Sequence, residues 1–150
     1  MKILFQKKSE TIIDRLICWW TRGPYFHCSV LFSDNTVLHG DNVLIEATRG
    51  FGVRTFILEN YDPDHWDAID VPMSDSEEAE VKEWAVKEIG CKYDWSGLIW
   101  SQVFRIPREH PDKWFCSEFA VAALQQAARL PGVKPCSVSP NGLARILKNR

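Results

Sequence analysis

Apolar and polar positions alternate with two different periods along the first part of the chain. A helical period runs over residues 9–20, and Gly23-Pro24 ends it. Strict alternation then runs over residues 25–32, which predicts a strand with His27 on one face and Cys28 on the other. Because the face of Cys28 is apolar, we expect this thiol to lie in the core.

The remaining pattern predicts further strands and then mostly helices. Strands are expected over 43–48, 54–58 and 65–71, with a shorter candidate at Val37-Leu38, and helices over 74–88, 116–130 and 141–148, with a partly helical segment over 93–104. Strands followed by helices are typical of an α+β fold, in which an antiparallel sheet packs against helices. A length of 150 residues fits a single domain, residues 1–150.

Composition and charge exclude several classes of function. A net charge of −2 without a basic run gives no bulk electrostatic argument for binding to nucleic acid or to an anionic membrane. No stretch is long and apolar enough for stable membrane insertion, and the apolar residues 1–5 are followed at once by polar ones, so no secretion signal is expected. Five irregularly spaced cysteines without a C-x-x-C pair favour reduced thiols in the cytoplasm over disulfides or a structural zinc site.

Tryptophan is unusually frequent, with seven residues in the chain. We expect most of them to form a large aromatic core. The alternative is that some line a groove for an apolar or extended ligand, and the sequence leaves this open for Trp19-Trp20 and Trp100.

The strongest chemical signal is Cys116, where a loop becomes the best-formed predicted helix. Unpaired backbone N–H groups and the positive end of the helix dipole favour a thiolate there. The same N–H groups can stabilise an oxyanion formed from a substrate carbonyl. The alternative is a buried cysteine that only packs the start of a helix. Glu118 has a structural explanation, because a carboxylate in a first helical turn stabilises the dipole.

A base and its orienting carboxylate are predicted on neighbouring strands. His27 can take the thiol proton, although a histidine at a sheet surface is often only structural. If residues 34–41 form an excursion and the flanking strands pair, Glu46 lies opposite Ser29 and diagonally from His27. Glu46 would then orient the imidazole and stabilise its charged form. The alternative is a solvated strand glutamate.

The other histidines are weaker candidates. His39, His65 and His110 fall in predicted turns or loops, whereas a base needs a rigid support. A metal site built from His27, Cys28 and Cys116 is excluded because adjacent strand residues point to opposite faces. We expect no metal and no cofactor.

Together these parts resemble the circularly permuted branch of the NlpC-type papain-like cysteine hydrolases, which also includes lecithin:retinol acyltransferase-like proteins. In that branch a strand histidine comes first and the helix-start cysteine comes late. The matching pieces span most of the chain and are Phe26-His27-Cys28-Ser29-Val30, Leu44-Ile45-Glu46-Ala47, Gly90 to Asp94, Phe115-Cys116-Ser117-Glu118 and Ser139-Pro140. Cys28 departs from the pattern, since the family often has a small aliphatic residue there.

The resemblance implies Cys116 as nucleophile, His27 as base and Glu46 as its orienter, within a permuted papain-like fold. Tyr93 and Ser117 are the candidate substrate and oxyanion residues. The implied reaction is amide hydrolysis through an acyl-enzyme, with peptides of bacterial cell-wall type as substrates. A chain without an export signal would act on cytosolic fragments, or reach the wall with a phage or secretion apparatus.

Two alternatives remain open at this point. The first is a lipid acyltransferase or thioesterase that uses the same Cys–His pair, in which case the ligand is lipid-like rather than a peptide. The second is a binding module that keeps the scaffold without catalysis. The oligomeric state is not indicated by the sequence.

Overall fold

The computed structural model of the protein describes residues 1–8, 11–33, 42–102 and 112–149. Strands and helices follow one another in a mixed order, with one short 3-10 helix at 135–137. The elements are β1 Lys2–Gln6, α1 Ile12–Thr21, β2 His27–Leu31, β3 Asn42–Thr48, β4 Gly52–Leu58, β5 Trp66–Asp70, α2 Asp75–Lys87, β6 Lys92–Tyr93, α3 Trp95–Gln102, β7 Lys113–Trp114, α4 Cys116–Gln126 and α5 Pro140–Lys148.

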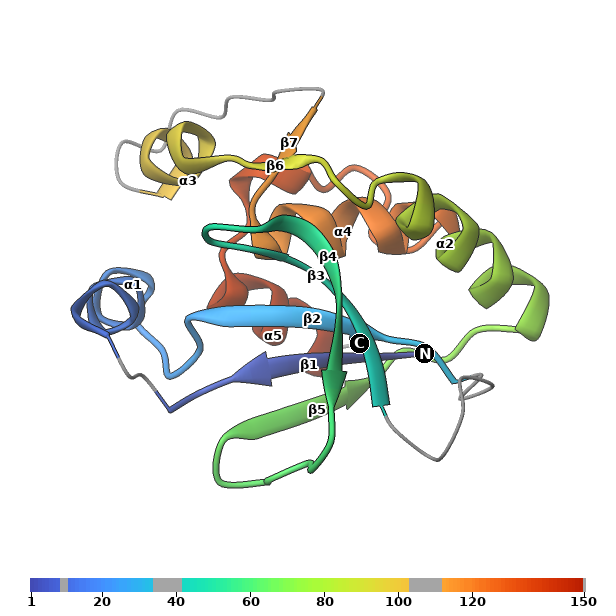
Figure 1. Cartoon of the computed structure of the whole chain (residues 1–150), viewed down its shortest axis with the longest axis horizontal. Coiled ribbons are helices and arrows are strands. Elements are labelled where there is room, and N and C mark those ends of the chain that lie inside the picture. Colours follow the sequence, from blue (N-terminus) through green and yellow to red (C-terminus); the bar gives the residue numbers. More distant parts are fainter. Residues whose placement is uncertain (9–10, 34–41, 103–111, 150) are drawn as a thin grey trace.

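Five strands form an antiparallel sheet in the order β4-β3-β2-β1-β5 (Figure 1). The predicted α+β class, with an antiparallel sheet and packed helices, is confirmed. The strand β1 lies inside this sheet, yet the sequence pattern assigned it no strand. Its residues Ile3, Leu4 and Phe5 are all buried, one after another, so both faces of the strand are covered. A strand that is buried on both faces shows a continuous apolar run instead of alternation.

The main core lies between one face of the sheet and the helices α4 and α5. Cys28 and Val30 of β2 and Ile45 of β3 meet Phe119 and Leu143 of these helices there. The opposite face of the sheet carries a smaller apolar cluster, formed by Leu4, Leu44, Leu58 and Trp66. The expected burial of Cys28 is confirmed.

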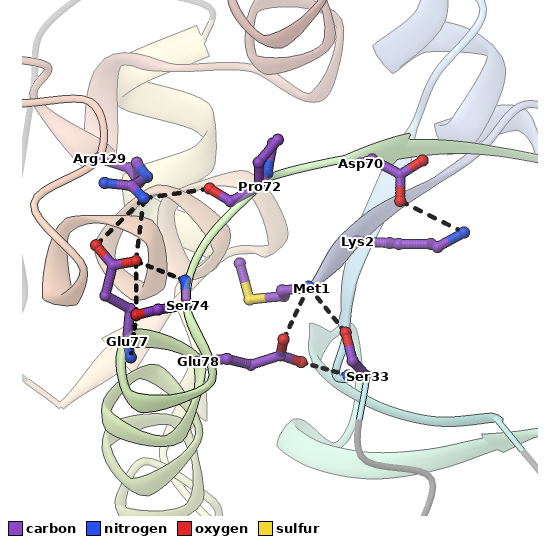
Figure 2. A network of polar contacts seen from close by, with 9 residues as sticks. All are labelled: Met1, Lys2, Ser33, Asp70, Pro72, Ser74, Glu77, Glu78 and Arg129. Atoms are coloured by element: carbon purple, nitrogen blue, oxygen red, sulfur yellow. Dashed lines mark hydrogen bonds and ion pairs between the residues drawn. The ribbon is translucent and has the colours of Figure 1, made fainter.

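A polar network fixes α2 against the sheet and the end of α4 (Figure 2). Glu78 accepts hydrogen bonds from the amino group of Met1, at 2.9 Å, and from the backbone N–H of Ser33. The adjacent Glu77 pairs with Arg129 at 3.2 Å, and Ser74 caps the helix. These contacts hold α2 close to the sheet from its first turn.

Several boundaries differ from the predictions. The helix that begins at Cys116 ends at Gln126 rather than at residue 130, and Ala128 and Leu130 beyond it take positive φ angles. A short parallel pair, β6 with β7, was not predicted. The candidate strand at Val37-Leu38 and residue 9, where the first helical period was predicted to begin, lie outside the described residues, and Thr11 is the residue that caps α1.

The expectation that most tryptophans form a core is only half right. Trp66 is buried, and Trp84 and Trp114 pack against the main core. By contrast, Trp19 and Trp20 of α1 and Trp95 of α3 are exposed. Trp19 and Trp20 are exposed because of the way α1 is oriented. Asp14 is the one buried residue of this helix, so the apolar side of the helix faces outward.

Candidate active site

Cys116 is the first residue of α4, as predicted, and its side chain is nearly covered, with 3% of the residue exposed. The preceding residue, Phe115, is extended and has no side chain that caps the helix. The positive end of the helix dipole therefore lies beside the thiol. The carboxylate of Glu118 accepts a bond from the N–H of Phe115 at 3.4 Å, which agrees with its structural explanation.

His27 and Glu46 meet on one face of the sheet. Val30 pairs with Ile45 and Leu31 with Leu44, so the same register places Ser29 opposite Glu46. The predicted pairing of these two strands is thus confirmed.

The carboxylate of Glu46 contacts three side chains on this face. Its Oε2 lies 2.7 Å from Nε2 of His27 and accepts a hydrogen bond from Oγ of Ser29 at 2.9 Å. Its other oxygen accepts two hydrogen bonds from the guanidinium of Arg54, at 3.0 and 3.1 Å. A buried carboxylate with this many donors stays ionised.

The ionisable groups of the site change one another's pKa values. Burial alone lowers the pKa of His27, but hydrogen bonds to Cys116 and Glu46 outweigh it and raise the pKa to about 10. Burial raises the pKa of Glu46, but the hydrogen bond and charge of His27, with Ser29 and Arg54, lower it to about 2. Hence His27 is a cation and Glu46 an anion at neutral pH.

The pKa of the Cys116 thiol is shifted in the opposite direction to the pKa values of Cys18, Cys28 and Cys91. A hydrogen bond from Cys28 and then the bond and charge of His27 hold the pKa of Cys116 well below its ordinary value, against the effect of burial. Burial raises the pKa of Cys18, Cys28 and Cys91. An imidazolium–thiolate pair follows from these directions.

Cys28 takes a part in the site that strand alternation did not predict. Its side chain belongs to the main core, yet both its thiol and its backbone N–H bond to Cys116. His27 is the first residue of β2, and its imidazole also lowers the pKa of Cys116.

The two predicted oxyanion residues have different surroundings. Tyr93 lies on β6, and burial together with the charge of Cys116 raises its pKa well above the ordinary value, so its phenol stays protonated and can donate. The hydroxyl of Ser117 is fully buried and donates to the carbonyl of Val138 at 2.6 Å. Because this hydroxyl already donates to Val138, it cannot also donate to a substrate oxyanion.

A cavity of about 230 Å³ opens beside His27 and Glu46. Its polar lining comes mainly from the sheet, and one wall comes from α1. The lining residues are Gln6, Ile17, Phe26, His27, Glu46, Thr48, Arg49, Arg54, Phe56, Trp66 and Tyr93. The cavity gives a ligand access to the side of the site formed by His27 and Glu46.

Sequence reasoning missed Arg54 as a partner of the site. Arg54 pairs directly with Glu46 across β3 and β4, and its guanidinium also lies over the ring of Phe51, 4.5 Å from the centroid. The turn at Gly50, with φ of 87°, sets this register. A hairpin drawn through that turn would have placed Arg54 opposite Glu46.

The remaining histidines are not part of this arrangement. His65 pairs with Asp62 through a short hydrogen bond, at the start of β5. His39 and His110 lie outside the described residues. Within the described ranges, no group of three or more His, Cys, Asp or Glu side chains could hold a metal ion. In the same ranges, no helix has the length and apolar character needed to cross a bilayer.

Comparison with known proteins gives no family assignment. No protein-family model matches the chain, and no curated protein sequence matches it. The case for function therefore rests on the geometry of the site.

Proposed function

We propose that the protein is a cysteine hydrolase that cleaves amide bonds through an acyl-enzyme, on a permuted papain-like scaffold. The observation that carries this proposal is the charged chain of contacts from Glu46 through His27 to Cys116. The order of its parts, with the strand histidine before the helix-start cysteine, supports the permuted arrangement.

In the proposed reaction the thiolate of Cys116 attacks the carbonyl carbon and forms a C–S bond. His27 gives its proton to the amide nitrogen, the C–N bond breaks, and the amine leaves. His27 then takes a proton from water, whose oxygen attacks the thioester, and the C–S bond breaks to restore the thiolate. Glu46 stays ionised throughout and holds the imidazole in place.

The lining of the cavity supports a small peptide as substrate. Two guanidiniums, Arg49 and Arg54, stand beside the carboxylate of Glu46, together with the amide of Gln6. Such groups suit the carboxylate and amide groups of a peptide, and the resemblance favours peptides of cell-wall type.

Lipid acyl transfer or thioester hydrolysis is the second candidate. The apolar part of the cavity, from Phe26, Phe56 and Trp66, favours it. The same acyl-enzyme would form, and an alcohol or amine would replace water in the transferase case. A panel of peptide amides and acyl esters, run against wild type and Cys116→Ala, separates the two reactions.

The proposal is tested by the pH dependence of iodoacetamide alkylation, mapped by mass spectrometry. We expect Cys116 to react well below pH 8.5, the ordinary pKa of a thiol. We also expect it to react faster than Cys18 or Cys91 and to lose that advantage in His27→Ala. The control is His65→Ala, which removes a histidine outside the site. If Cys116 reacts no faster than the other thiols, catalysis is excluded and a binding module becomes the better explanation.

A further inference from the structure

The helix α1 presents its apolar side to solvent. Five large apolar residues lie along this side, with exposed fractions of up to 76%: Ile12, Ile13, Leu16, Trp19 and Trp20. Their spacing places them on one face, and Figure 1 shows α1 standing at one end of the sheet. Five exposed residues of this size form a contiguous patch, which is typical of a surface that binds something.

Polar contacts on the opposite side hold the helix in this orientation. Asp14 is buried and pairs with Arg49, and it also accepts a bond from the N–H of Thr11 at 3.1 Å. At the other end, Asn141 of α5 donates to Oγ of Thr21 at 2.6 Å. The helix is therefore anchored by its polar side, and its apolar side takes no part in the core.

Three exposed arginines lie on α1 or beside its C-terminal end. Arg15 lies on α1 and is exposed, and Arg22 is exposed at its C-terminal end. Arg145 of α5 is also exposed, and it donates to the carbonyls of Thr21 and Arg22 at that end. The one acidic residue of the helix, Asp14, is buried and paired. The outer surface of α1 is thus apolar and cationic.

We propose that α1 docks the protein onto an anionic lipid surface, with the helix lying in the plane of the interface. A helix with tryptophan and aliphatic residues on one side and arginines at its margin suits that position, because the apolar side chains enter the acyl boundary and the guanidiniums meet phosphate groups. A second copy of the chain is a poorer partner, since pairing of two such helices would bring their arginines together.

The docking would also place the cavity at the lipid surface. Ile17, on the flank of the same helix, lines the cavity that holds His27 and Glu46. Docking itself does not depend on the proposed reaction, because none of the exposed residues of α1 contacts Cys116.

The test is co-sedimentation of the full chain with vesicles of phosphatidylcholine alone or mixed with phosphatidylglycerol. We expect binding to the mixed vesicles, a blue shift of tryptophan emission, and at least about tenfold weaker partitioning for Leu16→Gln combined with Trp19→Gln. Arg15→Glu should weaken binding to the mixed vesicles more than to the neutral ones. The matched controls are Val86→Gln on α2 and Ile57→Gln on β4, which remove exposed apolar residues elsewhere.

Three results would overturn the proposal: no binding to mixed vesicles, equal binding by the α1 double variant, or a dimer in solution that the double variant dissociates. Cys116→Ala should bind vesicles as the wild type does. Vesicle binding by a chain whose Cys116 is unreactive would refute the hydrolase and leave the docking surface intact. Circular dichroism of the double variant checks that α1 substitutions leave the fold unchanged.

Discussion

The Nε2 atom of His27 lies 2.7 Å from Oε2 of Glu46, although nineteen positions separate the two residues in the chain. The contact depends on the antiparallel register of β2 and β3, which sets Ser29 opposite Glu46 and His27 diagonally to it. Because Arg54 and Ser29 also bind the carboxylate, Glu46 keeps its charge and fixes the imidazole from behind.

Glu46→Gln should therefore lower the reactivity of Cys116 and leave the shape of the site unchanged. Loss of the carboxylate charge lowers the pKa of His27 and shifts the proton back toward Cys116. We expect the alkylation profile of Cys116 to move to higher pH and turnover of a peptide amide to fall by roughly 10²-fold or more. Glu83→Gln, which breaks only the exposed pair with Lys87, is the control and should leave both unchanged. An unshifted profile in Glu46→Gln would show that the carboxylate does not tune the pair.

The stability of the protein should fall in acid, partly because of Glu46. Its pKa is about 2 in the folded chain against an ordinary 4.5, so its contribution is complete above pH 4.5 and is lost as pH falls toward 2. The full contribution is about 3 kcal/mol. The measurement is the free energy of unfolding in urea for wild type and Glu46→Gln.

Other carboxylates with lowered pKa values, such as Asp67 and Glu78, also destabilise the fold in acid, so the difference between the two chains isolates Glu46. That difference should shrink as pH falls from 4.5 to 2. A difference that stays constant over this range would contradict the assigned charge of Glu46.

Cys28→Ala tests the second thiol of the site. The thiol of Cys28 donates to Cys116, and its removal leaves the backbone N–H of residue 28 and His27 as donors. We expect the pKa of Cys116 to rise and its alkylation below pH 7 to slow several-fold. Cys136→Ala, which removes a fully buried thiol from a separate cluster with Leu98 and Phe115, should leave that rate unchanged.

Arg49→Leu tests how α1 is held. The substitution leaves the carboxylate of Asp14 buried without its cation, which should lower the free energy of unfolding by about 3 kcal/mol. Lys2→Leu is the control, because its ion pair with Asp70 is exposed and should contribute less than about 1 kcal/mol. Addition of Asp14→Asn to Arg49→Leu should restore part of the loss. Equal effects of the two single substitutions would show that the Asp14 pair does not anchor α1.

The local sequence pattern predicted much of the fold and the identity of the candidate active-site residues. Alternation predicted the strand of His27 and the burial of Cys28, and the apolar spacing predicted α2 and a helix that begins at Cys116. These features depend on neighbours within a few positions, so a single sequence contains them. The strand β1 was not predicted, because burial on both faces removes the alternation that indicates a strand.

The contacts that define the site depend on tertiary structure. Residue order cannot give the register that brings Arg54 to Glu46, or the approach of Cys28 to Cys116, because strand pairing and helix docking fix both.

The sequence by itself determined the α+β class, the helix-start position of Cys116 and the candidate pair of His27 with Glu46, through local periodicity. Only the tertiary structure decided which side of α1 faces the protein. Periodicity defines an apolar face but not its direction, and here the buried ion pair of Asp14 with Arg49 turns that face outward.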